Sequence, residues 1–599
     1  MNALPTSIEQ LAPTRSYWKV ASRWAPLLPV LAFLFVMLVY PVGQLLLLSI
    51  KSGDASFTTE HYRRAFSNEV YVHILLITIK IAALTALISV LVSYPVAYLI
   101  ATSRRSAKSQ LIFWVILPFW TSFLVRTFAW VVIFGRNGLA NQMLQAVGIT
   151  DAPLELLYNL RAVLIGMAHA MIPLCIMTMI SVMEAIEGNL PRAAATLGAR
   201  PGNAFWRIYF PLSLPGVAAG GLLVFITALG FFITPAFLGG RQETMITQII
   251  IEQVIDLLNW SFAGVLSVLL LVAGLVIFAI YNRLLGISSF AGVAGGKAQS
   301  VRDRPSGSGR VGRAIVNTLG NVSDIASIAL TKAFSQTRSR SRTGRRLLWG
   351  VALLVLVFLC LPTLVMIPIS FTESTVLDWP PKGFSLEWYR ALWQSPLWLQ
   401  AALRSLLVAL GAALLAMLIG TPAAFALARS RIRGKAAVLG FVMAPLIIPR
   451  IIIAVALFYL YARVGLVGTY SGLILGHTVL AIPYVVVTLS AVLKGYDTRL
   501  DQAASNLGAT NFKTLVYVTL PILRSGLISA FLFAFITSFD ELTVALFVSG
   551  GLTATLPKQL WDSAILQVTP TLAAASALLL LFVTLLIFVA ERLRAASAR

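Results

Sequence analysis

The sequence predicts an all-α polytopic membrane protein. Of its 599 residues, 58% are hydrophobic and only 11% are charged, a composition that excludes an ordinary soluble domain. We count about 12 apolar stretches of the length that spans a bilayer, roughly 20 residues. The pattern of the first six recurs in the second six, so we expect about 12 transmembrane helices in two parallel six-helix repeats.

The expected spans divide the chain into four parts. Those of the first half cover residues 24–50, 71–102, 109–134, 161–183, 213–238 and 260–285. Those of the second half cover residues 346–371, 398–428, 436–462, 470–494, 523–548 and 567–590. We therefore expect a cytoplasmic tail at 1–20, a first transmembrane domain at 21–290, a linker at 291–345 and a second transmembrane domain at 346–599.

Basic residues cluster in particular connections between the spans. One group follows the second span and the other follows the eighth: Arg104, Arg105 and Lys108, then Arg429, Arg431, Arg433 and Lys435. The positive-inside rule places both connections, and both chain termini, in the cytoplasm. The net charge of +24 is thus explained by topology and indicates no nucleic-acid partner. The basic linker is either a flexible tether or a contact for anionic membrane lipid.

A short segment rich in small residues follows the fourth and tenth spans. Its shared residues are Ala193, Ala194, Leu197 and Gly198 in the first copy, and Ala503, Ala504, Leu507 and Gly508 in the second. The glycine-to-proline spacing is the same in both copies, from Gly198 to Pro211 and from Gly508 to Pro521. A helix with a shallow face, ended by glycine outside the bilayer, suits docking in a groove of another protein.

These segments resemble the EAA loop of permease subunits in binding-protein-dependent ABC importers. The Glu of the family pattern is absent, since Pro191-Arg192 and Asp501-Gln502 precede the paired alanines. The resemblance implies a type I ABC importer permease fold in a bacterial inner membrane. It also implies that the eight shared residues couple the chain to two copies of an ABC ATPase subunit, and that a periplasmic or extracellular solute-binding protein delivers the substrate.

The chain itself has no recognisable ATP site. Gly295-Gly296-Lys297-Ala298 lacks the upstream glycine and the Ser or Thr of a P-loop, so we expect no enzymatic activity and no cofactor. Cys175 and Cys360 lie in unmatched apolar spans and indicate neither a disulfide framework nor a metal site. The alternative is a secondary active transporter with a 6+6 parallel repeat.

Further motifs narrow the resemblance to the two permease subunits of spermidine/putrescine-type importers, fused in one chain. These motifs are Leu117–Ser122, Gly230–Gly240 and Ser538-Phe539-Asp540-Glu541. The resemblance implies a small cationic solute. Carboxylates within a span are costly and usually face a cavity or a partner. We therefore place Asp540 and Glu541 on the substrate path, with an internal ion pair to Arg126 or Arg450, or a cap on a broken helix, as the alternatives. The remaining path candidates are aromatic: Phe119, Trp120 and Phe231.

Overall fold

The computed structural model describes residues 24–51, 56–119, 121–285, 318, 340–429, 432–566 and 568–597. Across these ranges the protein is helical, and one isolated bridge between Lys51 and Phe57 is the sole β pairing. The expected tail at 1–20 lies outside the described residues, as does nearly all of the expected linker up to residue 339. The helix α18 begins at Arg340 and so includes the last residues assigned to that linker.

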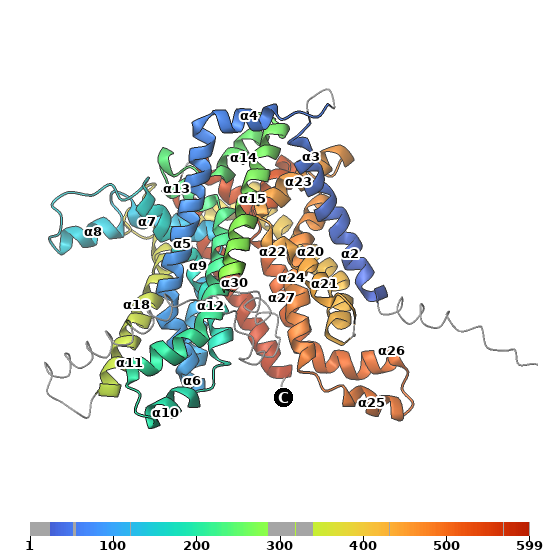
Figure 1. Cartoon of the computed structure of the whole chain (residues 1–599). Coiled ribbons are helices and arrows are strands. Elements are labelled where there is room, and N and C mark those ends of the chain that lie inside the picture. Colours follow the sequence, from blue (N-terminus) through green and yellow to red (C-terminus); the bar gives the residue numbers. More distant parts are fainter. Residues whose placement is uncertain are drawn as a thin grey trace, which may run out of the picture.

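Most long helices of the first half form one bundle, whereas its first span lies beside helices of the second half (Figure 1). The first span of this half consists of α2 and α3, joined by a π-helical turn at Phe35–Val39. The bounds of its main helices are Leu28–Leu34 (α2), Tyr40–Leu48 (α3), Glu69–Thr102 (α5), Arg105–Phe119 (α6), Phe123–Phe134 (α7), Leu160–Met183 (α9), Phe210–Leu229 (α12), Ile233–Leu238 (α13) and Trp260–Leu285 (α15).

Helices of the second half repeat this order. Their bounds are Arg340–Ile369 (α18), Pro396–Arg429 (α20), Lys435–Val442 (α21), Ala444–Ile447 (α22), Arg450–Val464 (α23), Tyr470–Lys494 (α24), Leu520–Phe539 (α27), Thr543–Val548 (α28) and Pro570–Ser597 (α30). The three-helix cores α5–α9–α12 and α20–α24–α27 correspond to each other and are the most closely packed groups.

Ten helices in the described part of the chain are long and apolar enough to cross a membrane. The predicted fold class, a polytopic helical membrane protein built from two repeats, is confirmed, and several of the expected spans are interrupted. The stretch at 436–462 is divided into α21, α22 and α23, whereas the stretch at 567–590 is covered from Pro570 on by one continuous helix, α30. Pro449 explains the break before α23: it has no backbone N–H and it disfavours a helical Ile448, which is extended here.

The expected spans at 213–238 and 523–548 also end early. The helix α12 stops at Leu229 and α27 stops at Phe539, and each is followed by a second short helix, α13 or α28. The third expected span, 109–134, is likewise divided between α6 and α7. Broken helices therefore occur at corresponding places in both halves.

The first span of each half packs on the other half. The helix α18 lies against α5, α6 and α7, while α3 lies against α23. Two polar contacts mark these junctions: the His169 Nε2 atom lies 3.0 Å from the Leu359 carbonyl oxygen, and the Tyr461 hydroxyl lies 3.7 Å from the Met37 sulfur. Each half therefore supplies one span that packs against helices of the other half.

Candidate functional site

Two short helices project from one end of the molecule. They are α10 (Asn189–Thr196) and α25 (Arg499–Asn506), which lie on opposite sides of the lower end in Figure 1. Gly198 and Gly508 follow them with the same φ of +83°, a left-handed conformation that favours glycine. The sequence prediction that these glycines end the helices is confirmed.

The hydrogen bonds at the two helix ends match as well. In the first copy the Ala199 N–H donates to the Ala194 carbonyl oxygen at 2.9 Å, and the Gly198 N–H donates to that of Ala195 at 3.1 Å. The second copy has the same two bonds at positions 310 residues later, both at 3.0 Å. This is the Schellman arrangement, which fixes the direction in which the chain leaves the helix.

Leucine side chains lie at the tip of each projecting segment. Leu197 is 89% exposed and Leu507 is 88% exposed, and a Cβ atom added at Gly198 or Gly508 would meet no atom within 4 Å. Ala193 and Ala503 are also exposed, whereas Ala194 is buried and Ala504 is half-buried. The structure thus divides the eight candidate coupling residues: six face outward and two support the loop from within.

The second loop has a polar anchor at Asp501. The Asp501 carboxylate accepts hydrogen bonds from the Tyr496 hydroxyl at 2.5 Å and the Thr519 hydroxyl at 2.9 Å, and it lies 2.8 Å from the Arg429 guanidinium. In the first copy Pro191 stands at the position of Asp501. Our sequence reasoning missed this network, although the basic connection containing Arg429 and the acidic residue beside the paired alanines were both visible.

The environment of Asp501 favours its charged form. Burial raises the pKa of the carboxyl, but the hydrogen bonds from Tyr496 and Thr519 and the charge of Arg429 lower it further, so the net pKa is below its ordinary value. The Arg429 guanidinium also lies over the rings of Phe425 and Tyr496, at 5.2 and 4.8 Å from their centroids. The end of α20 is therefore tied to α25.

Broken helices meet between the two halves. A Cβ atom added at Gly230, which ends α12, would lie 3.1 Å from the Pro449 Cβ atom at the break before α23. At the corresponding place in the second copy, Asp540 ends α27, and its carboxyl interacts with the Ser122 hydroxyl at the break before α7. At these corresponding positions the second half has the Asp540 carboxylate, whereas the first half has Gly230, which has no side chain.

Arg126 is buried and Asp540 is half-buried, and the polar atoms of both are only partly satisfied. The Asp540 Oδ1 atom and the Arg126 Nε and Nη2 atoms have no hydrogen-bond partner among the described residues. The Arg126 Nη1 atom donates to the Ala170 carbonyl oxygen at 3.3 Å, and its guanidinium lies 4.4 Å from the Phe123 ring centroid. Asp540 interacts electrostatically with Arg126 and Arg450. These are the two partners that the sequence offered for an internal ion pair, although none of the ion pairs within 4 Å among the described residues includes Asp540.

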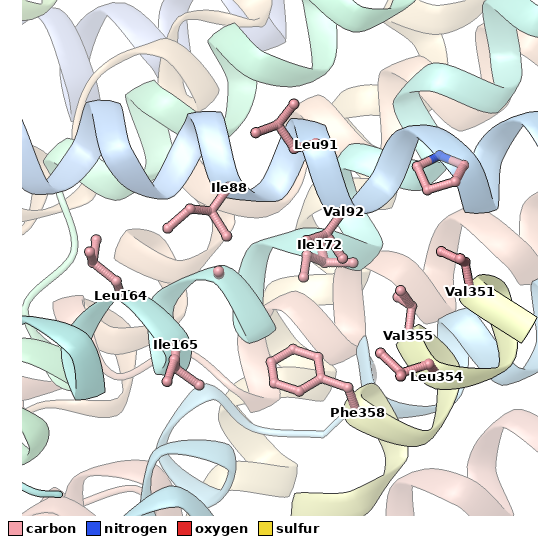
Figure 2. A pocket seen from close by; sticks show the side chains of 12 residues that line it. Ile88, Leu91, Val92, Leu164, Ile165, Ile172, Val351, Leu354, Val355 and Phe358 are labelled. Atoms are coloured by element: carbon pink, nitrogen blue, oxygen red, sulfur yellow. The ribbon is translucent and has the colours of Figure 1, made fainter. Parts of the chain in front are cut away.

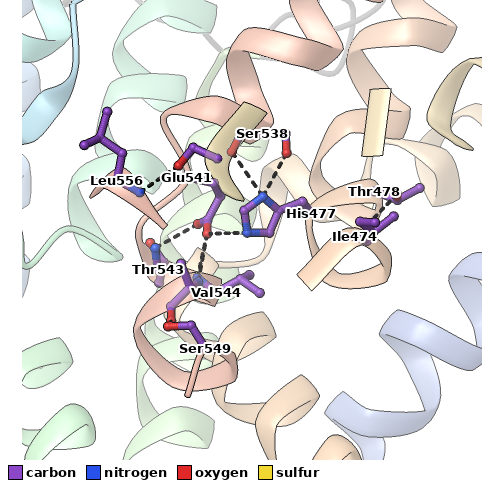
Figure 3. Close-up of polar contacts among 11 residues, drawn as sticks. Ile474, His477, Thr478, Ser538, Glu541, Thr543, Val544, Ser549 and Leu556 are labelled. Atoms are coloured by element: carbon purple, nitrogen blue, oxygen red, sulfur yellow. Dashed lines mark hydrogen bonds and ion pairs between the residues drawn. The ribbon is translucent and has the colours of Figure 1, made fainter. Parts of the chain in front are cut away.

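Glu541 caps a broken helix. The sequence left this role open as the alternative to a place on the substrate path. Its carboxylate accepts hydrogen bonds from the backbone N–H groups of Thr543, Val544 and Ala545, at the start of α28 (Figure 3). Its Oε2 atom lies 3.7 Å from the His477 Nε2 atom, and both side chains are 1% exposed. A carboxylate satisfied in this way holds the broken helix in place.

Of the aromatic candidates, Phe119 is half-buried at the end of α6 and Phe231 is buried directly after Gly230. The Phe231 ring lies 5.3 Å from that of Phe123, which also contacts Arg126. Trp120 lies outside the described residues. Within the described ranges, no group of three or more His, Cys, Asp or Glu side chains is placed to hold a metal ion.

Comparison with known proteins gives a consistent result. The family described as "Binding-protein-dependent transport system inner membrane component" matches this chain twice, at residues 28–286 and 416–599. The spermidine/putrescine transport system permease protein PotB of Haemophilus influenzae is 33% identical over 231 residues, which is 38% of this chain and 80% of that protein. PotC of the same organism is 34% identical over 238 residues, which is 40% of this chain and 92% of that protein.

Among solved structures, a bacterial ABC transporter involved in the import of the acidic polysaccharide alginate is similar to part of the chain. The similarity covers 45% of this chain and 97% of the other, at 18% identity and a TM-score of 0.40.

Proposed function

Because the chain belongs to the family of binding-protein-dependent transport system inner membrane components, we propose that it forms the complete translocation pathway of an ATP-driven importer for a small cationic solute. The duplicated family match supports one chain in the place of two permease subunits. ATP hydrolysis would belong to two copies of a separate ATPase subunit, and a solute-binding protein would supply the substrate from the opposite side of the membrane.

The duplicated end geometry of α10 and α25 is the observation that carries this proposal. Two exposed leucines, each held by a helix end of identical backbone conformation, present matching surfaces at one end of the molecule. Two copies of one motor protein would find two equivalent docking points there. Their closure would bring the two six-span units together and change access to the centre. In this proposal the projecting loops and both termini are cytoplasmic, as the basic connections favour.

We assign the charge recognition of the substrate to Asp540. Its Oδ1 atom is buried and free to accept a hydrogen bond from an ammonium group, in the region where the broken helices meet. Phe119 and Phe231 are candidates to contact the methylene chain, and Trp120 remains a candidate from the sequence alone. Glu541 is left out of this assignment because backbone N–H groups already occupy its oxygens. The named relatives transport spermidine and putrescine, which supports a polyamine as the first substrate to test.

The coupling proposal is tested with the full chain, its ATPase subunits and its binding protein in proteoliposomes. Gly198→Val and Gly508→Val place a β-branched residue at a φ of +83°, a conformation that such residues rarely adopt. We expect ATP hydrolysis to continue while ATP-dependent uptake falls at least tenfold. Gly43→Val is the control, because its added Cβ atom would meet nothing within 4 Å. Full uptake in both loop variants would contradict the coupling assignment, and uptake without any ATPase subunit would favour the secondary transporter.

The substrate proposal is tested with Asp540→Asn, which keeps the side-chain shape but removes the charge. We expect the KM for putrescine and spermidine uptake to rise at least tenfold while the melting temperature stays within a few degrees. The control is Asp562→Asn, because the Asp562 side chain is 42% exposed and its carboxylate is already paired with Lys558. Unchanged uptake of both polyamines by Asp540→Asn would contradict the role of Asp540 without affecting the coupling proposal.

A further inference from the structure

A groove runs along the junction where α18 of the second half packs on the first half. It has a volume of about 490 Å³ and is lined by twelve residues of α5, α9 and α18, all of them apolar (Figure 2). Its floor is formed by Ala168, Ile172 and Val355, which are buried. Its edges are open, since Leu91 is 63% exposed and Leu354 is 71% exposed.

The groove lies within the part of the protein that the bilayer surrounds. All three helices that form it are long and apolar enough to span a membrane. Its volume is in the range of about 300–1,000 Å³ that is typical of small-molecule sites, but it offers no polar side chain to orient a polar ligand. A hydrocarbon chain is the ligand that such a lining accepts.

Four arginines lie on the helix ends and turn beyond this groove, on the side of the projecting loops. One lies in the turn between α5 and α6, one begins α6, and two lie in the first turns of α18: Arg104, Arg105, Arg345 and Arg346. All four are exposed. Arg345 interacts electrostatically with Tyr98, which is one turn beyond the groove residue Pro95 on α5. None of the ion pairs formed among the described residues includes any of these arginines, whereas the neighbouring Lys108 is paired with Glu184 at 2.6 Å.

We propose that this groove and its arginine rim form a binding site for one anionic phospholipid of the leaflet on the side of the projecting loops. One acyl chain lies in the groove between α5, α9 and α18, and the arginines contact the phosphate of the headgroup. The lipid would then fill the gap between the first helix of the second half and the bundle of the first half. This proposal does not depend on the identity of the transported solute.

The arginine rim is tested by native mass spectrometry of the delipidated full chain, titrated with phosphatidylglycerol or with phosphatidylcholine of the same acyl chains. Wild type should bind one phosphatidylglycerol in preference to phosphatidylcholine. A basic residue near a membrane surface strengthens binding to anionic lipid by about fivefold, so Arg104→Gln with Arg345→Gln should weaken phosphatidylglycerol binding by about 25-fold. The control pair Arg283→Gln with Arg592→Gln removes the same charge from the ends of α15 and α30.

The groove itself is tested with Ala168→Phe, which places a ring on the floor, against Leu275→Phe on the exposed face of α15. Only the first should weaken the binding of both lipids. Equal binding of the two lipids by wild type, or an arginine pair variant that binds like its control, would overturn the proposal. Should Ala168→Phe fail to fold, the arginine variants decide the question alone, because their side chains are exposed and not needed for packing.

Discussion

Asp501 should hold the second projecting helix in place, and removing it should loosen α25 without unfolding the protein. The Asp501→Ala substitution removes the acceptor of two hydroxyl hydrogen bonds and the partner of Arg429. A hydrogen bond to a charged group contributes about 1.5–3 kcal/mol. Because these side chains are 21–29% exposed and act as one network, we expect a total of about 3 kcal/mol rather than the sum of three bonds.

Amide hydrogen exchange of residues 499–507 measures this effect directly, because exchange of a local segment reports its opening free energy. A loss of about 3 kcal/mol should accelerate exchange by about 100-fold. The matched control is Asp497→Ala, two residues before the same helix. Asp497 is 50% exposed and pairs with Arg499, which is 85% exposed, and it accepts a hydrogen bond from the Arg499 backbone N–H at 3.0 Å. Exposed pairs contribute about 0–1 kcal/mol, so the control should accelerate exchange much less than Asp501→Ala. Equal exchange rates in the two variants would refute the reasoning, and so would an unchanged rate in Asp501→Ala.

The direction of the Asp501 pKa shift gives a further check on the same prediction. Because the folded-state pKa is below the ordinary value of 3.8, the stabilisation is complete above that value and is lost as the pH falls through the lower folded pKa. After correction for intrinsic exchange, protection of α25 should therefore be constant between about pH 6 and 8. A decline across that range would show that another group controls the contact.

Two other substitutions test the packing of the fold. Glu541→Ala removes the acceptor of three backbone N–H groups, so we expect a loss of about 3 kcal/mol in the free energy of unfolding; Glu541→Gln, which keeps one carbonyl oxygen, should cost less, and equal melting temperatures would argue against the cap. Gly138→Ala would place a Cβ atom 2.2 Å from the Val132 carbonyl oxygen, so it should lower the melting temperature, whereas Gly43→Ala has open space and should leave it nearly unchanged.

Local features of the fold could be predicted from the sequence, while features set by packing could not. The ends of α10 and α25 follow from a glycine placed after a helical pattern, since a left-handed residue is a local requirement. The break at Gly230 was not predicted, and the break at Asp540 was left open only as an alternative, because the apolar residues continue on both sides of each and hydrophobic periodicity does not reveal where a helix changes direction. The packing of α18 on α5 and α7 depends on contacts between distant segments, for which the sequence gives no signal.

The same distinction applies to the candidate site. Asp540 could be singled out because a carboxylate in an apolar stretch is costly, but the adjacent Glu541 carries the same signal and has a different environment. The two differ in their surroundings: Glu541 faces the free N–H groups at the start of α28, whereas the Asp540 Oδ1 atom meets no donor among the described residues. Sequence alone could not separate them, because the difference arises one residue after the helix ends.

The two halves differ at the places where a symmetrical machine would be expected to match. Gly230 corresponds to Asp540 at the centre, and Pro191 corresponds to Asp501 at the projecting loops, while the helix order and the glycine conformations are retained. Retained backbone geometry is what two identical motors would require, since each must find the same surface. One solute bound once at the centre needs no such equivalence there. The divergence is therefore expected if force is applied symmetrically through the loops and the substrate is recognised mainly by the second half.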